Sequence, residues 1–112
     1  MKKKEIKFPA DINVLNIVDK YVKKYSESKF NKHDYLLGNQ SVTIYTYEIQ
    51  YLDGFELIPI QGLIETIIVS KDEEGTAVTV YVGGAYDRIL ARALTSKIAD
   101  HFISYLKNET TH

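Results

Sequence analysis

Apolar and polar positions follow two different periods along this chain, and each change of period predicts the boundary of an element. Residues 3–8 alternate, which predicts a short strand that Pro9 ends because proline cannot donate to a sheet. Apolar residues then recur at helical spacing from Val14 to Tyr25, with Asp11 as the expected N-cap, and this spacing predicts an amphipathic helix. Residues 26–40 follow neither period, so we interpret them as a connection with room for a short strand or turn.

The next segment is dense in β-branched and aromatic side chains. Residues 41–52 therefore predict a strand. Asp53 and Gly54 come directly after it and are a strong signal for a two-residue hairpin turn into another strand from Phe55. The run that begins there is too long for one strand, so we divide it at Gly62, where a missing side chain suits a bend.

Glycines mark the two remaining boundaries. Residues 71–75 (KDEEG) predict a second hairpin loop, and residues 76–82 predict the last strand. Gly83-Gly84 then precedes a long helical pattern over residues 85–106, and we expect a mobile tail over 108–112. Because no complete phosphate-binding motif surrounds these glycines, we interpret the pair as a sharp turn of the chain.

The predicted order is β-α-β-β-β-β-α in a single α+β domain, residues 1–112. Its hairpins require a curved, mainly antiparallel sheet, and both helices are available to cover one face of it. This order resembles two known architectures, the TATA-binding-protein-like half-repeat and a shortened helix-grip fold of lipid-transfer and polyketide-cyclase proteins. The resemblance implies a fold and assigns no functional residue.

Composition narrows the classes of protein. The 112 residues are 45% hydrophobic and contain no cysteine, which excludes a disulfide scaffold, a thiolate metal site and a thiol nucleophile. No apolar stretch approaches the roughly 20 residues that span a bilayer, and the basic N-terminus lacks the apolar run of a secretion signal. We therefore expect a cytoplasmic protein without a membrane partner.

Charge is unevenly distributed although the net charge is only −1. Residues 1–33 carry a net charge of +5, residues 34–76 carry −7, and the remainder carries +1. A nucleic acid would have to bind the Lys-rich first helix, and no aromatic side chains are interleaved with its lysines for base stacking. Nucleic acid is therefore the least favoured partner.

Tyrosines in the predicted strand over residues 41–52 suggest an interface. If they lie on the same face of the sheet as Tyr81, that face carries an aromatic patch able to pair with another subunit. The alternative is that they form ordinary cross-strand pairs. The interface candidates, with one helical residue added, are Tyr45, Tyr47, Tyr51, Tyr81 and Phe102.

The last helix carries an apolar stripe at every fourth residue, which drifts around a straight helix by about 40° per step. Either the helix crosses a twisted sheet, or its second half packs on another subunit while a polar stripe faces a cavity. The second alternative predicts a site for a small anionic or polar ligand. Its candidate residues are Tyr86, Lys97, His101 and Ser104.

Catalytic and metal-binding patterns are weak. His33, His101 and His112 lack the spacing of metal ligands, and no nucleophile motif surrounds the serines, so we expect neither cofactor nor metal and favour a nonenzymatic role. Three functions follow in order of preference. The first is a noncatalytic interaction or homodimerisation module, the second a small-ligand-binding protein, and the third a nucleic-acid binder.

Overall fold

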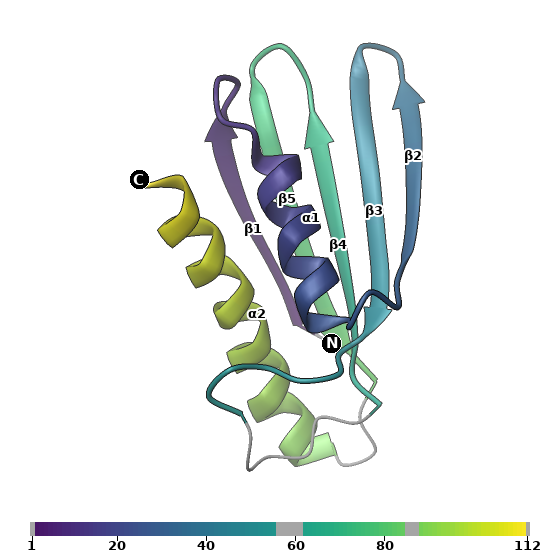
Figure 1. Ribbon diagram of the computed structural model, residues 1–112, viewed down its shortest axis with the longest axis vertical. Helices are drawn as coiled ribbons and strands as arrows, with labels where there is room; N and C mark the ends of the chain where they lie inside the picture. The colour runs from purple at the N-terminus through teal and green to yellow at the C-terminus, as the bar shows by residue number, and fades with distance from the viewer. Residues whose placement is uncertain (1, 56–61, 85–87, 112) are drawn as a thin grey trace.

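A computed structural model describes residues 2–55, 62–84 and 88–111 of the chain. One antiparallel sheet of five strands, in the order β1-β5-β4-β3-β2, carries both helices on one face (Figure 1). The elements are β1 (Lys2–Pro9), α1 (Val14–Tyr25), β2 (Asn31–Leu37), β3 (Gln40–Glu48), β4 (Ile64–Lys71), β5 (Gly75–Gly83) and α2 (Arg88–Thr110). The predicted α+β class, the antiparallel sheet and the long C-terminal helix are confirmed. The order β-α-β-β-β-β-α agrees only as a string, because β2 was not among the predicted strands.

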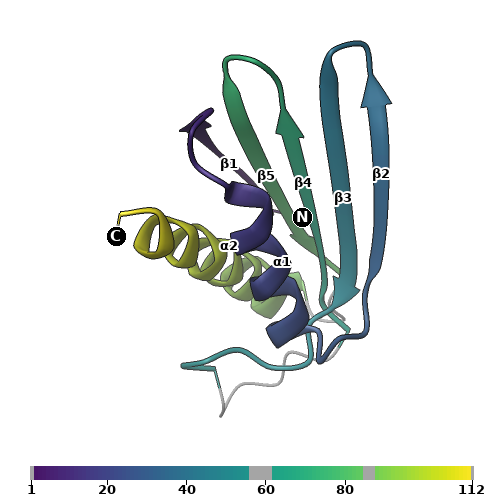
Figure 2. The ribbon, with the colours of Figure 1, turned by 45° about the horizontal axis from the view of Figure 1, so that its top comes forward.

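The face covered by the helices, called the inner face below, is the apolar one. Val78, Val80 and Val82 of β5 are buried there, as the alternation of that strand predicts. Strand register places Tyr45 opposite Ile67, and Ile67 opposite Val80, so the strand tyrosines belong to the same inner face. The opposite, outer face is covered by no described helix (Figure 2).

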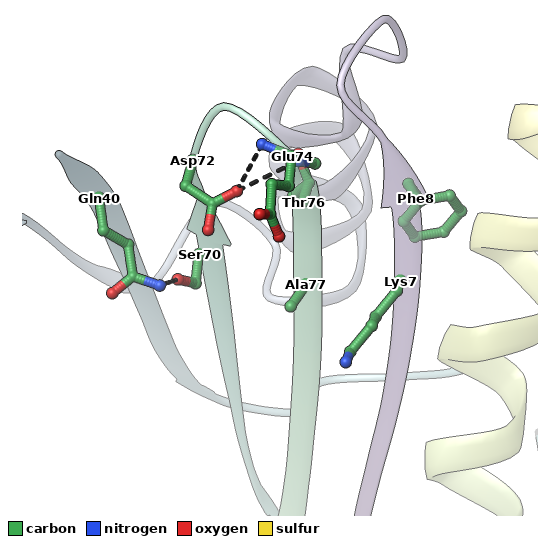
Figure 3. Close-up of a pocket in the computed structure, with 9 residues that line it drawn as sticks. Lys7, Phe8, Gln40, Ser70, Asp72, Glu74, Thr76 and Ala77 are labelled. Atoms are coloured by element: carbon green, nitrogen blue, oxygen red, sulfur yellow. Dashed lines mark hydrogen bonds between the residues drawn. The ribbon is translucent and has the colours of Figure 1, made fainter.

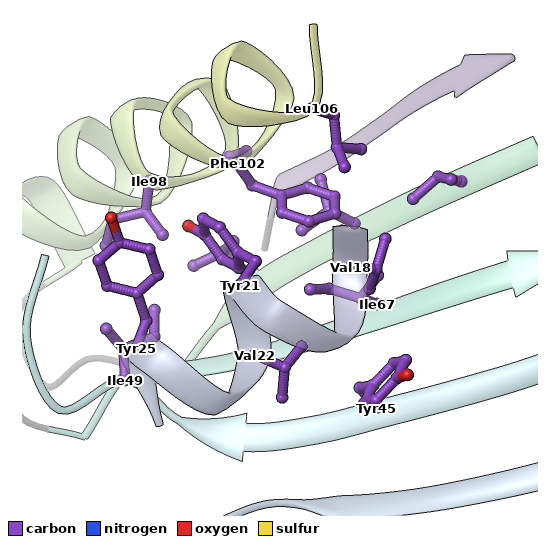
Figure 4. Close-up of a cluster of buried hydrophobic side chains, with 14 of the residues drawn as sticks. Val18, Tyr21, Val22, Tyr25, Tyr45, Ile49, Ile67, Ile98, Phe102 and Leu106 are labelled. Carbon is purple, nitrogen blue, oxygen red and sulfur yellow. The ribbon is translucent and has the colours of Figure 1, made fainter. Parts of the chain in front are cut away.

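The later residues of the apolar stripe of α2 are buried by contacts within the chain. Ile98, Phe102 and Leu106 are fully buried, and they lie beside α1 and the sheet in Figure 4. The Tyr21 ring of α1 packs 4.9 Å from Phe102 and 5.0 Å from Tyr105, centroid to centroid. α2 contacts β5, β1 and α1, so the later residues of the stripe pack within the chain.

The segment over residues 26–40 contains a complete strand that the pattern missed. β2 and β3 form a hairpin around Gly38-Asn39, where Gly38 has a φ of 66°, a conformation that glycine adopts without steric cost. Every residue of β2 is exposed. A strand with no buried side has no reason to alternate apolar and polar residues, so its period is absent from the sequence.

The hairpin predicted at Asp53-Gly54 is wrong. A turn is present, since Gly54 has a φ of 86° and the Phe55 N–H donates to the Leu52 carbonyl at 3.1 Å, but none of the described residues 49–55 belongs to a strand. β3 instead ends at Glu48, opposite Ile64 of β4, so a long connection over residues 49–63 joins the two strands. The second strand expected from Phe55 falls mostly on residues 56–61, which lie outside the described residues.

Both helix boundaries differ slightly from the prediction. Asn13, not Asp11, caps α1: its Oδ1 accepts the Asn16 N–H at 3.4 Å. α2 continues to Thr110, so most of the tail expected over 108–112 is helical. The error arose because the last turn of α2 is polar, and its sequence therefore shows no apolar period.

Two loops follow the prediction. The β4–β5 hairpin over residues 72–74 is fastened by Asp72, whose Oδ1 accepts the backbone N–H of Glu74 at 2.8 Å and of Gly75 at 3.2 Å. Gly84 has a φ of 92°, and a Cβ there would lie 2.8 Å from the Gly62 carbonyl oxygen. This close approach requires glycine and supports the interpretation of residue 84 as part of the turn that ends β5.

Candidate functional site

The predicted ligand residues of α2 occupy different environments. Lys97 and Ser104 are exposed, whereas His101 is half-buried against α1. The His101 Nδ1 lies 2.9 Å from the Tyr21 hydroxyl oxygen, and its ring lies 5.1 Å from that of Tyr25. Tyr86 falls outside the described residues. Ligand binding by these residues stays a prediction.

The histidine and tyrosine pair favours neutral side chains. Burial is the main cause that lowers the pKa of His101, and burial also raises the pKa of Tyr21 well above its usual value. A neutral imidazole and a neutral phenol share one hydrogen bond at neutral pH without a net charge. This arrangement suits a stabilising contact between α1 and α2.

A buried carboxyl group lies deeper on the inner face. Glu65 of β4 is fully buried, the Tyr47 hydroxyl donates to its Oε1, and its Oε2 has no hydrogen-bond partner among the described residues. Burial raises the pKa of Glu65 to about 8, so the group is mostly protonated at neutral pH. The position of Glu65 in the sequence was a sign of its burial. Alternate residues of a strand lie on the same face, and Leu63, Ile67 and Val69, which alternate with Glu65 in this way, are all buried.

The tyrosines proposed for an interface lie on the wrong face for it. Tyr45 and Tyr47 are buried on the inner face, while Tyr81 lies on the outer face, so these three do not form a shared aromatic patch. The hydroxyl of Tyr45 donates to Asp19 at 2.8 Å, and the hydroxyl of Tyr47 donates to Glu65, so both are hydrogen-bonded inside the chain. The alternation of side chains along a strand does not show which face of the sheet the helices cover. The sequence therefore left open whether Tyr45 and Tyr47 share a face with Tyr81.

The other two interface candidates also make contacts within the chain. Phe102 is fully buried between α1, α2 and the sheet. Tyr51 is partly exposed, and its ring packs 5.5 Å from Tyr25. Phe102 is therefore not available at the surface, whereas an interface role of the partly exposed Tyr51 stays a prediction.

An exposed apolar group lies instead along β2. Tyr35 is 50% exposed, Leu36 76% and Leu37 60%, and these are the three most exposed large apolar side chains of the described residues. β2 is the last strand of the sheet, so one row of its backbone N–H and C=O groups faces no strand of the described chain. No helix covers it in either view (Figures 1 and 2). We call Asn31–Leu37 the open edge.

A polar hollow of about 300 Å³ lies beside the β4–β5 hairpin (Figure 3). Lys7, Ala77 and Ser70 lie side by side in the register of β1, β5 and β4 and form part of its lining, with Ala77 as a small side chain in the middle. Asp72 and Glu74 of the hairpin also line it. The hollow therefore presents one ammonium group and two carboxylates.

The chain matches no protein-family model, no curated protein and no solved structure to a significant degree. Neither described helix is long and apolar enough to cross a bilayer. Within residues 2–55, 62–84 and 88–111, no three His, Asp or Glu side chains lie close enough together to hold a metal ion. Similarity to known proteins therefore assigns no functional site to this chain.

Proposed function

We propose that this protein is a noncatalytic interaction module and that its open edge accepts an extended polypeptide segment as an added strand. The observation that carries this proposal is the exposure of all seven residues of β2. Backbone groups of an unpaired edge bind an incoming strand through main-chain hydrogen bonds, and neighbouring side chains provide specificity. Leu36 and Leu37 supply apolar surface, since full burial of a leucine contributes about 1.5–3 kcal/mol.

The other edge of the sheet is unsuited to the same role. β1 carries Lys2, Lys3, Lys4 and Lys7 and ends at Pro9. Lysine and proline on an edge strand oppose the addition of another strand, because each new pair would desolvate or repel charge. β2 has one lysine and no proline.

A peptide-display experiment tests the proposal. A library of extended ten-residue peptides is selected on the wild-type protein and on the double variant Leu36→Lys/Leu37→Lys. We expect wild-type binders that lose at least about tenfold in affinity on the variant, because two apolar contacts are replaced by charges.

A matched control adds the same two charges elsewhere. Asn108→Lys/Thr111→Lys places two lysines at exposed positions at the end of α2, far from β2 in Figure 1, and should bind the selected peptides as the wild type does. Peptides that bind the open-edge variant as tightly as the control would overturn the proposal.

A small-ligand-binding role is the second candidate, and the hollow beside the hairpin favours it. Lys7 together with Asp72 and Glu74 suits a zwitterionic molecule, because both kinds of charge have a partner. Thermal-shift measurements with amino acids test this role, with Lys7→Ala/Asp72→Ala as the variant that should lose any shift. The same screen on His101→Ala/Lys97→Ala tests the site predicted on α2.

Nucleic-acid binding remains the third candidate, and the ion pairs of α1 weaken it. Lys23 pairs with Asp19 at 2.7 Å, and Lys24 pairs with Asp53 at 3.2 Å. Lys32 lies 3.5 Å from the same Asp19 carboxylate. These pairs reduce the positive potential that phosphates would need.

For the finer fold, we favour the TATA-binding-protein-like half-repeat over the shortened helix-grip fold. An open sheet with both helices on one face supports this choice, because a helix-grip fold curves its sheet around the long helix to enclose a cavity. We also expect the protein in the cytoplasm.

A further inference from the structure

Side chains that share the inner side of the β2 segment follow a self-complementary pattern. Lys32, Asp34 and Leu36 of β2 alternate with residues of the outer side and stand in one row, and Phe30 directly precedes the strand in the same phase. The row reads apolar, cation, anion, apolar. Read backwards against itself, as an antiparallel copy would present it, the row places apolar residues opposite apolar ones and each charge opposite the opposite charge.

We propose that the strand accepted by the open edge is β2 of a second copy of this chain, paired antiparallel about a twofold axis at His33. This inference rests on the proposed function and names its partner. The register places Lys32 opposite Asp34 of the partner subunit, and the reverse, while Phe30 faces Leu36 at both ends of the ladder. The two sheets then become one continuous sheet of ten strands.

Charge selects this register over its neighbours. Directly opposite residues of an antiparallel pair point to the same face, so the axis must pass through a residue, and the register moves in steps of two positions along one strand. An axis at Asp34 would place two carboxylates opposite each other, and an axis at Tyr35 would place Leu36 opposite a carboxylate. Like charges that are directly opposite destabilise a strand pair, whereas opposite charges stabilise it.

The charged side chains that make the new pairs are accessible, whereas Phe30 is partly buried and its ring lies 6.0 Å from that of Tyr45. Lys32 is partly exposed; its Nζ lies 3.5 Å from Asp19 and 5.5 Å from the centroid of the Tyr45 ring. Asp34 accepts the Thr43 hydroxyl through Oδ1 at 2.7 Å, and its carboxylate has a second oxygen for a partner ammonium. α1 lies over the middle of the sheet rather than over β2, so a second sheet can approach in the same plane (Figures 1 and 2).

Cysteine cross-linking tests the register directly, since the chain has no cysteine of its own. In the proposed register, His33→Cys places two thiols across the axis at the roughly 4.5–5.5 Å Cα separation of opposite residues, within the span of a disulfide. We expect H33C to form a covalent dimer under mild oxidation. Asn31→Cys and Tyr35→Cys should not cross-link alone, because each lies four residues, about 13 Å along the strand, from its own copy.

A mixture of the two control proteins gives a second test. Residue 31 lies opposite residue 35 of the other copy, so N31C and Y35C proteins that stay apart alone should form a mixed disulfide when combined. Cross-linking of Y35C with itself, in place of H33C, would overturn the register.

Charge reversal tests the same ladder without covalent chemistry. Asp34→Lys occurs twice in a dimer and turns both attractive pairs into repulsive ones, which should raise the dimer dissociation constant by about 10- to 100-fold in sedimentation velocity. The double variant Lys32→Asp/Asp34→Lys restores both pairs and should return the constant to within about threefold of the wild-type value. A double variant as weak as the single one would overturn the ladder.

The failure of this inference is distinguishable from failure of the proposed function. A wild-type protein that stays monomeric at millimolar concentration, with no H33C dimer, overturns the second copy as partner. Peptides selected on the open edge would then still support an interaction module. If the edge binds no peptide and forms no dimer, both are overturned.

Discussion

The two edge strands of this sheet, β1 and β2, differ in how far the rest of the chain covers them. β1 closes the core: Phe8 is buried, α2 packs along the strand, and Lys4 forms an ion pair with Asp100 of that helix. β2 pairs only with β3 and buries no residue. An edge that is protected by lysines and a helix adds stability, whereas an open edge is available for binding.

The largest expected difference between the edges is in stability. Phe8→Ala on β1 should lower the free energy of unfolding by about 3–5 kcal/mol, because it removes a buried aromatic side chain. Leu36→Ala on β2 should change the stability of the monomer by less than about 0.5 kcal/mol, as expected for an exposed side chain. Urea denaturation at low protein concentration compares the two. Equal losses would show that β2 belongs to the cooperative core.

Next in size is a pH effect that should arise in the core and not at the open edge. Glu65 has a pKa raised to about 8, whereas the unfolded carboxyl has its ordinary value near 4.5. The folded state therefore holds a proton that the unfolded state releases between these values. Stability is full below about pH 4.5 and is lost as the pH rises to about 8, by up to roughly 1.4 kcal/mol per pH unit.

Glu65→Gln should remove this slope, because the amide keeps the shape without ionising. Denaturation of both proteins at pH 5, 6.5 and 8 measures the effect. Leu36→Ala, as the open-edge control, should keep the wild-type slope. A slope that survives in E65Q would assign it to another group.

A smaller effect is expected when lysines are removed from β1, because both edges of the sheet are then open to association. Lys3→Thr/Lys7→Thr removes two outward lysines from β1, and we expect association to strengthen by about tenfold, with species larger than a dimer. Sedimentation velocity measures it. Lys20→Thr/Lys71→Thr removes the same charge from exposed positions on α1 and on the central strand β4, away from either edge, and should leave association unchanged. Equal behaviour of the two variants would attribute the effect to net charge alone.

The smallest effect should come from the ion pairs beside each edge. A double-mutant cycle on Lys4 and Asp100 should give a coupling energy of about 0.2–1 kcal/mol, since both side chains are partly exposed. The cycle on Lys32 and Asp19 beside β2 should give no more than this. A coupling above about 2 kcal/mol at Lys4 would mean that the pair, and not apolar packing, holds α2 to β1.

The parts of the fold that were predictable are those with one buried side. α1 and β5 each carry a single apolar stripe, so their type, limits and buried faces could be read with little error. β2 carries no such stripe and was missed, and the strand predicted over residues 41–52 was extended past Glu48, where β3 ends. The sequence signal for a turn at Asp53-Gly54 was correct. The strand before it nevertheless ends at Glu48, because β3 pairs with β4 only as far as Glu48 and Ile64.

The candidate site was less predictable than the fold. His101 was singled out as a ligand-binding residue of α2, which stays a prediction, and its contacts with Tyr21 and Tyr25 depend on how α1 crosses α2. The open edge escaped notice because exposure of β2 is a property of strand order. In the sequence, Leu36 and Leu37 resemble ordinary core residues. They are exposed because β2 is the outermost strand of the sheet.

The sequence by itself determined the class of the fold, the helices, the hairpin at residues 72–74 and the valine face of the last strand, because periodicity and turn chemistry act over a few residues. Only the tertiary structure decided which face the tyrosines occupy, that Glu65 is buried and that β2 lies outermost. These depend on contacts between segments far apart in the chain, such as β1 with β5. The row of Phe30, Lys32, Asp34 and Leu36 was present in the sequence throughout, but only the strand order places it at an open edge of the sheet.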